Sequence, residues 1–284
     1  MHDGRTVRSG VGVVHLHCGS ATDVGRVREI NEDSHFASSP VFVVADGMGG
    51  HQSGEVASAI AVEEFARLAH DGYDSTKATE VVTSTLLECQ RRIQAYGEEH
   101  RSEGDAEWYA GTTVAAALLC EDEEGAKWLL TNLGDSRIYK LHNDRLDQVS
   151  VDHSLVQELL DAGEIDADAA AVHPERHVIT RALGGPVFRA PDFFVLPLTS
   201  AERLVLCSDG VSGMIDDAQI HRIVSTTDDP RDAAHALVAA AVEAGGDDNA
   251  TAVVVDVVGL SESAMLEASR TEPVSLEEKL GALP

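Results

Sequence analysis

Four short apolar runs in this chain each border an aspartate that lies in a turn containing glycine. Asp46, Asp135 and Asp209 follow such runs, and Asp248 precedes the last one. Short apolar runs with β-branched residues among them are typical of buried strands. A single Asp-Gly pair after a strand is ordinary turn chemistry. Four such turns allow a different arrangement, in which the strand ends converge and the carboxylates meet at one end of the fold.

Carboxylates that meet within a few ångströms repel one another, and an unpaired buried charge is very costly. Divalent cations remove this conflict, and ligand sets made only of oxygens favour Mg²⁺ or Mn²⁺. The carbonyl of Gly47, beside Asp46, can supply one more oxygen. Two such ions about 3.5–4 Å apart activate water against a phosphoryl group in phosphatases. The residues alone leave both interpretations open, a metal site and separate turns.

The remaining pattern predicts one α+β domain over residues 11–258, because strands and helices do not alternate regularly. Consecutive strands with tight turns between residues 112 and 149 indicate antiparallel sheet. The first ten residues are polar and are expected to form a loose segment. Helices are expected at about residues 53–70 and 76–96, and further helices begin at Ser154, Asp216 and Pro230.

Two segments lack the pattern of a core element. Residues 164–190 show no clear period, and a long irregular segment inside a domain is often a functional flap. The polar tail, residues 259–284, carries Leu276, Leu280 and Leu283. This spacing is compatible with a short amphipathic helix that packs on the body or docks on a partner.

The charge balance excludes several classes of partner. Acidic residues outnumber basic ones by 49 to 21, and the formal net charge is -28. Nucleic acid and anionic membrane surfaces are therefore not expected as general partners. No apolar run approaches the roughly 20 residues of a membrane helix, the N-terminus shows no cleavage-site pattern, and the four cysteines form no CxxC pair. We expect a cytoplasmic protein.

Six segments, in order, resemble the motifs of the metal-dependent protein phosphatase family, the protein phosphatase 2C type, and most closely its bacterial serine/threonine phosphatases. The likeness spans about Val13 to Val258. Each segment alone is a weak signal, whereas six in the right order are highly specific. The segments are Arg28–Asp33, Val44–His51, Gly111–Thr113, Leu133–Arg137, Cys207–Gly210 and Gly246–Thr251.

The resemblance implies a β-sandwich of two antiparallel sheets flanked by α-helices on both sides, with metals in a cleft at one end. It implies a serine/threonine protein phosphatase that hydrolyses phosphoserine and phosphothreonine by direct attack of a water or hydroxide bridging two Mn²⁺ or Mg²⁺ ions. Its substrates would be phosphoproteins made by a cognate serine/threonine kinase. Residues 164–190 match the position of the family's mobile flap.

The resemblance also implies the ligands of the catalytic centre. Asp46 would bridge the two ions, and the Gly47 carbonyl would bind one of them. Asp209 and Asp248 would bind the other. Asp135, together with Asp209, would form the third metal site found in bacterial relatives.

Four further residues would surround these ligands. Arg28 would hold the substrate phosphate. Glu32 and Asp33 would orient metal-bound waters, and Asn249, beside the ligand Asp248, would belong to the same outer set.

The chain departs from the family pattern at two positions. Some members have a histidine directly after the Asp-Gly pair as a proposed general acid, and this chain has Met48. The residue that protonates the leaving alkoxide is therefore not identified. Relatives often have proline where this chain has Asp247, which makes the ligand register ambiguous, although Asp248 beside Asn249 is the better match.

Two other phosphatase mechanisms fit the sequence poorly. A cysteine-dependent phosphatase needs an arginine six residues after its thiolate, and none of the four cysteines has one. The Asp166-Ala167-Asp168 sequence resembles an aspartyl-phosphate motif but does not follow a strand. The alternative that stays open is a catalytically weak or inactive phosphatase-like module that binds and regulates.

Overall fold

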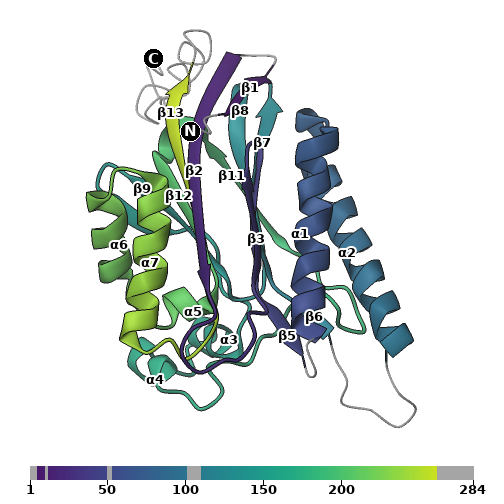
Figure 1. Cartoon of the computed structure of the whole chain (residues 1–284), viewed down its shortest axis with the longest axis vertical. Helices are drawn as coiled ribbons and strands as arrows, with labels where there is room; N and C mark the ends of the chain where they lie inside the picture. The colour runs from purple at the N-terminus through teal and green to yellow at the C-terminus, as the bar shows by residue number, and fades with distance from the viewer. Residues whose placement is uncertain (1–4, 10–11, 50–52, 101–109, 261–284) are drawn as a thin grey trace, which may run out of the picture.

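The structure, a computed structural model, describes residues 5–9, 12–49, 53–100 and 110–260. Two antiparallel β-sheets lie face to face, with helices on both outer sides (Figure 1). Helices α1 (Ser53–Asp71) and α2 (Ala78–His100) cover one sheet, and α6 (Asp217–Thr226) and α7 (Pro230–Ala244) cover the other. This arrangement confirms the predicted α+β sandwich with four layers.

The sheet beneath α6 and α7 has six strands in the order β1-β2-β13-β12-β9-β10. Neighbouring strands are antiparallel throughout. The strands are β1 (Arg5–Ser9), β2 (Gly12–Asp23), β9 (Arg137–His142), β10 (Arg145–Gln148), β12 (Arg203–Cys207) and β13 (Ala250–Leu260).

The sheet beneath α1 and α2 has five antiparallel strands in the order β11-β8-β7-β4-β3. A separate pair, β5 and β6, lies at the N-terminal end of α1 (Figure 1). The strands are β3 (Ser34–Ser38), β4 (Val41–Ala45), β5 (Gly47–Gly49), β6 (Ala110–Thr112), β7 (Val114–Asp122), β8 (Gly125–Leu133) and β11 (Asp192–Pro197).

Strand β4 is apolar without a break, in keeping with the cover on both of its faces. In β4, Val41 and Val43 pack toward α1 and α2, whereas Phe42 and Val44 pack between the two sheets. Strand β12 alternates in the same way between the intersheet layer and the side of α6 and α7. A strand with two buried faces cannot show the alternating polar pattern of a half-exposed strand.

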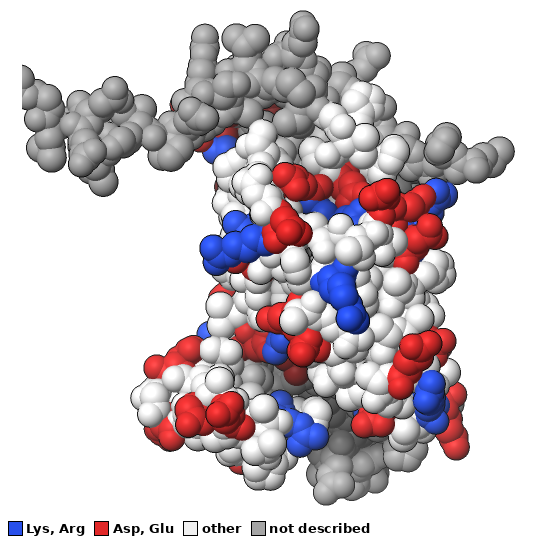
Figure 2. Space-filling view, turned by 90° about the vertical axis from the view of Figure 1, so that its left-hand side faces the viewer, with Lys and Arg blue, Asp and Glu red and all other residues white. Residues whose placement is uncertain are grey.

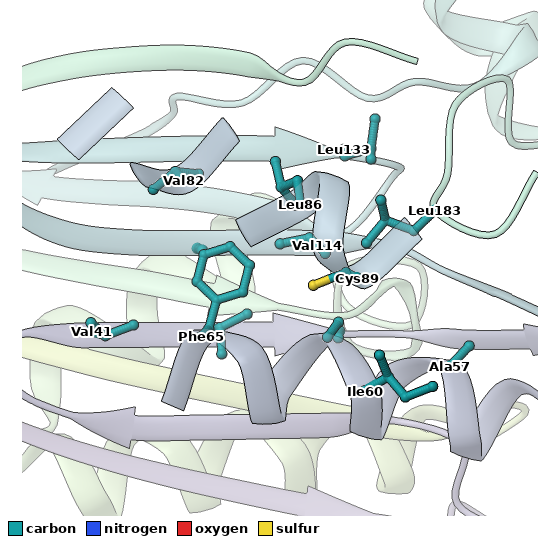
Figure 3. Packing of buried hydrophobic residues seen from close by; sticks show 14 of the residues in the cluster. Val41, Ala57, Ile60, Phe65, Val82, Leu86, Cys89, Val114, Leu133 and Leu183 are labelled. Carbon is teal, nitrogen blue, oxygen red and sulfur yellow. The ribbon is translucent and has the colours of Figure 1, made fainter. Parts of the chain in front are cut away.

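Figure 3 shows how the two long helices close their side of the core. Phe65 of α1 projects between the helices and the sheet, close to Val41 of β4. Leu86 and Cys89 of α2 pack from the other side. The helices predicted at about residues 53–70 and 76–96 are therefore confirmed as α1 and α2.

The shorter helices begin where the sequence predicts. Ser154 accepts a hydrogen bond from the backbone N–H of Gln157 at the start of α3 (Leu155–Asp161). Asp216 caps α6 and Asp229 caps α7 in the same way, with Pro230 in the first turn. Two further helices are α5 (Asp209–Ser212) and α4 (Ala167–Ala171), and 3₁₀ turns cover Ser75–Lys77 and Leu198–Ser200.

The sequence interpretation was wrong at the edges of the sheets. Residues 5–9, expected to be loose, form β1, which pairs with β2. Strand β3 was not predicted as a strand, and it pairs with β4 only. Edge strands depend on backbone pairing with one neighbour rather than on a buried apolar run, so their sequences carry little signal. The amphipathic helix predicted near Leu276 lies outside the described residues.

Charges are mixed on the surface that includes α6 and α7. Acidic and basic side chains alternate over that face, which shows no continuous basic area in Figure 2. In the part of the chain that the structure describes, no helix is both long enough and apolar enough to cross a membrane.

Candidate active site

The register of the sheet beneath α1 and α2 brings two of the four aspartates together. Val44 of β4 pairs with Ala115, and Leu133 of β8 pairs with Val114, so both strands end beside the start of β7. Asp46 follows β4 and Asp135 follows β8. The two carboxylates therefore lie at the same end of this sheet.

The register of the other sheet brings the remaining two aspartates to the same end. Cys207, the last residue of β12, pairs with Arg137 of β9 on one side and with Ala252 of β13 on the other. Asp209 therefore lies near the turn before β9 and the turn before β13. The turn before β9 carries Asp135 and crosses from one sheet to the other, which joins the two groups.

Thr113 fixes the positions of the first two turns relative to each other. Its hydroxyl accepts a hydrogen bond from the backbone N–H of Asp46 at 3.0 Å and lies 2.7 Å from the hydroxyl of Ser136. Its own N–H donates to the Asp46 carbonyl at 2.9 Å. Thr113 is fully buried. The Gly111–Thr113 motif marked this region, but nothing in the sequence indicated the bridging role of the threonine.

Two glycines of the site are required by close packing. A Cβ atom on Gly47 would overlap the carbonyl oxygens of Gly54 and Glu32. A Cβ atom on Gly210 would overlap the carbonyl oxygen of Asn249. The Asp-Gly pairs therefore let backbone segments from different elements meet behind the carboxylates.

Burial and mutual repulsion raise the pKa of the gathered carboxyl groups. Desolvation raises the pKa of Asp46 well above its usual value, and the neighbouring Asp33, Asp209, Asp135 and Asp248 raise it further. Burial, followed by the charge of Asp248, raises the pKa of Asp209, whose carboxyl group hydrogen-bonds that of Asp46.

Burial also raises the pKa of two further carboxyl groups in the cluster. Burial raises the pKa of Asp33 to about 7, against hydrogen bonds from the side chains of Thr251 and Ser208. Burial and the charge of Asp209 raise the pKa of Asp135 to about 8. One carboxylate oxygen of Asp135 is buried without a hydrogen-bond partner. Such groups need either protons or a cation, and a cation would satisfy the unpaired oxygen as well.

No three acidic, histidine or cysteine side chains among the described residues converge on one point as a finished metal-ligand set. Asp248 is instead turned toward Arg28, with 2.7 Å between their side-chain atoms. Both side chains are partly exposed, 36% for Asp248 and 50% for Arg28, so this ion pair is weak and a side-chain rotation separates it. Burial and mutual repulsion nevertheless act on the carboxyl groups of the whole cluster.

Asn249 holds the loop that carries Arg28. Its amide nitrogen donates to the carbonyl oxygens of Val24 and Ile30, both at 2.9 Å. Its amide oxygen accepts from the backbone N–H of Glu32 at 2.8 Å. Asn249 therefore joins the turn before β13 to the loop that carries Arg28 by three hydrogen bonds.

Glu32 and Asp33 bind protein groups at the back of the cluster. Glu32 accepts backbone hydrogen bonds from Gly54 and Glu55, in the first turn of α1, where a carboxylate is favourable. Asp33 accepts a hydrogen bond from the Ser208 hydroxyl at 2.8 Å.

The two candidates for the last ligand differ in burial. Asp248 is half-buried and acts on the pKa of Asp46, Asp33 and Asp209, whereas Asp247 is exposed. Met48 pairs through its backbone with Gly111. The cluster contains Asp33, Asp46, Asp135, Asp209 and Asp248, and Gly47 and Arg28 lie beside it.

Comparison with known proteins gives a consistent result. Residues 26–240 match the family model described as "Protein phosphatase 2C". The chain is 37% identical over 253 residues to the serine/threonine phosphatase stp of Listeria innocua, covering 85% of this chain and 96% of that protein.

Solved structures agree. The catalytic domain of the phosphatase PstP, in complex with two manganese ions, has a TM-score of 0.73 at 33% identity and covers 86% of this chain and 99% of that one. The phosphatase Stp1 of Staphylococcus aureus has a TM-score of 0.78 at 28% identity and covers 89% of this chain and 99% of that one.

Proposed function

This chain belongs to the protein phosphatase 2C family of metal-dependent serine/threonine phosphatases, and from this premise we propose that its acidic cluster is the catalytic centre that hydrolyses phosphoserine and phosphothreonine in proteins. One observation supports the assignment most. Four aspartates from four separate turns, Asp46, Asp135, Asp209 and Asp248, lie within electrostatic range of one another at one end of the sandwich. An acidic cluster of this density is unfavourable for folding and needs a functional reason.

The residues present fit divalent metal ions. The donors are carboxylates and a backbone carbonyl without histidine or cysteine, which suits Mg²⁺ or Mn²⁺. Asp46, Gly47, Asp209 and Asp248 would hold two ions, and Asp135 with Asp209 would hold a third. When bound, such ions supply Lewis-acid activation of water and neutralise charge on the phosphoryl group.

Arg28 is the substrate-binding residue of this proposal. Its guanidinium group lies at the edge of the cluster, half-exposed and paired with Asp248. Partial burial disfavours its charge, but the neighbouring carboxylates of Asp248, Glu32 and Asp46 outweigh this and raise its pKa. A permanently charged guanidinium with free N–H groups can take two phosphate oxygens at once.

The outer residues hold this arrangement in place. Asn249 fixes the Arg28 loop, and Glu32 and Asp33 face the cluster from behind. Met48 has no titratable group, so the proton for the leaving alkoxide does not come from the residue after the Asp-Gly pair.

The partners follow from the substrate. We expect phosphoserine- and phosphothreonine-containing proteins made by a cognate serine/threonine kinase. A cytoplasmic location accords with the four cysteines, none of which forms a disulfide.

The proposed function predicts phosphate release from a phosphothreonine peptide in the presence of Mn²⁺, and little release from the matched phosphotyrosine peptide. Excess chelator should abolish the release, and added Mn²⁺ should restore it. Free phosphate is measured with the purified full chain. Peptide binding without any phosphate release under these conditions would favour the alternative of an inactive regulatory module.

Replacing Arg28 by alanine should raise KM for the phosphopeptide by about 10- to 100-fold, since charge-assisted hydrogen bonds contribute roughly 1.5–3 kcal/mol. Mn²⁺ affinity should be unchanged or slightly higher, because Asp248 loses its competing partner. Arg26→Ala is a matched control, an exposed arginine of the same loop whose backbone N–H bonds Gly246. A large loss of Mn²⁺ affinity in Arg28→Ala would contradict the substrate-binding role.

A further inference from the structure

A buried histidine outside the acidic cluster is bonded to the turn that carries Asp135. The side chain of His153 is 4% exposed, and its Nδ1 atom lies 3.1 Å from the backbone nitrogen of Gly134. The backbone N–H of His153 donates to the Gly134 carbonyl at 2.9 Å. Gly134 is therefore held on both its polar groups by one residue that lies 19 positions later in the chain.

The partners fix which nitrogen of the imidazole carries the proton. The Gly134 nitrogen is a donor, so Nδ1 must be the acceptor and must be unprotonated. The hydrogen is then on Nε2, which lies 3.2 Å from a carboxylate oxygen of Asp192. Burial lowers the pKa of His153, in agreement with a neutral ring.

The Gly134 turn is also constrained by its other neighbours. The side-chain amide of Asn132 donates to the Gly134 carbonyl at 3.1 Å. Gly134 has a φ of +118°, and a Cβ atom there would lie 2.5 Å from a methyl group of Thr113. On the other side of Asp135, the Ser136 hydroxyl lies 2.7 Å from that of Thr113. Asp135 is thus held between two anchored neighbours while its own carboxylate keeps one unpartnered oxygen.

His153 is also bonded to the segment of residues 164–190, which the sequence predicted to be irregular. The N–H of Thr180 donates to the His153 carbonyl at 2.8 Å. Arg181 donates to the second oxygen of Asp192 at 3.2 Å. A continuous series of polar contacts therefore runs from Arg181 through Asp192 and His153 to Gly134.

We infer that His153 is a positioning residue. Its neutral imidazole holds the Gly134–Asp135 turn so that the Asp135 carboxylate is aimed at a metal ion. Its backbone carbonyl joins this turn to Thr180, within residues 164–190. The inference rests on the proposed function, since it takes Asp135 as a metal ligand. A partner behind a ligand-bearing residue typically changes metal affinity about 10- to 100-fold when it is replaced.

The first test needs no variant. In the nitrogen-15 spectrum of the chelated wild-type protein at neutral pH, the His153 ring should show a protonated Nε2 and an unprotonated Nδ1. The Gly134 amide should be strongly protected from hydrogen exchange. A ring protonated at Nδ1, or at both nitrogens, would overturn the inference.

The second test separates the two bonds of the ring. An asparagine side chain reaches about as far as Nδ1 and can accept from Gly134, whereas a glutamine reaches about as far as Nε2 and can donate to Asp192. Mn²⁺ titration by calorimetry and electron paramagnetic resonance should show that Asp135→Asn weakens one binding event. His153→Gln should weaken the same event about 10- to 100-fold, and His153→Asn should stay within a few-fold of wild type.

The outcomes distinguish the positioning role of His153 from the metal-ligand role of Asp135. If Asp135→Asn weakens Mn²⁺ binding but both His153 variants bind as wild type, or both lose equally, the positioning role is wrong and the metal site stands. If Asp135→Asn itself binds every Mn²⁺ ion as wild type, Asp135 is not a ligand and the inference falls with it. Measured unfolding temperatures of each variant verify that a loss of binding is not a loss of fold.

Discussion

Replacing Asp209 by asparagine is expected to lower Mn²⁺-dependent phosphopeptide hydrolysis by at least about 10²-fold, the scale on which removing one preorganised electrostatic group acts. Asparagine has almost the same shape but no charge. Asp209 lies at the centre of the cluster, since it hydrogen-bonds Asp46 and acts electrostatically on Asp135. Its loss therefore reaches more than one of the proposed metal positions.

The same substitution should not unfold the protein. In the chelated state Asp209 is a buried carboxyl group beside like charges, so an amide there relieves repulsion. The unfolding temperature of chelated Asp209→Asn should equal or exceed that of chelated wild type, while Mn²⁺ stabilises the variant less. Initial rates and thermal unfolding, with and without Mn²⁺, measure both effects.

Asp247→Asn is the matched control, because Asp247 is exposed and lies next to the proposed ligand Asp248. It should keep nearly full activity. Near-wild-type activity of Asp209→Asn would remove that residue from the catalytic centre, and a loss in Asp247→Asn equal to that in Asp248→Asn would shift the ligand register.

The strands and their aspartates were predictable because each signal is local. A fully apolar run that ends at Asp-Gly, such as the one before Asp46, contains in a few residues both a strand with two buried faces and its turn. The helix caps at Ser154 and Asp229 are local in the same sense. Each of these features depends on neighbours within one turn of chain.

The convergence of the aspartates depended on strand order, which composition and spacing do not encode. Asp135 reaches the cluster because its turn passes from one sheet to the other, between β8 and β9. Thr113 joins Asp46 to Ser136 across 67 and 23 residues of sequence. Likewise, nothing near His153 in the chain points to Gly134. The resemblance to a family supplied the convergence, and the supporting contacts needed coordinates.

Removing metal should make the stability of this protein fall as pH rises from about 5 to 8. The pKa of Asp33 is raised from 3.8 to about 7 and that of Asp135 from 3.8 to about 8. In this window the folded chain holds protons that the unfolded chain has already lost. The free energy of unfolding therefore decreases with pH, and the stabilisation present below the unfolded pKa disappears as the folded pKa is passed.

The expected size is a few kcal/mol, since the part of the Asp33 shift that lies between pH 5 and pH 7, about two units, corresponds to roughly 3 kcal/mol. Urea unfolding of the chelated protein at pH 5, 6.5 and 8 measures it. Saturating Mn²⁺ should remove most of the decrease, because the ions balance the carboxylate charges and bind only the folded chain.

Asp33→Asn tests whether titration of Asp33 causes the decrease in the free energy of unfolding with pH. Its amide oxygen still accepts from the Ser208 hydroxyl, but the buried titration is gone. Chelated Asp33→Asn should be more stable than chelated wild type at pH 8 and nearly equal to it at pH 5, where wild-type Asp33 is already protonated. Equal stability of the chelated wild type at pH 5 and pH 8, or a slope unchanged by Asp33→Asn, would mean that these acids are not crowded together in the way that makes a cation necessary.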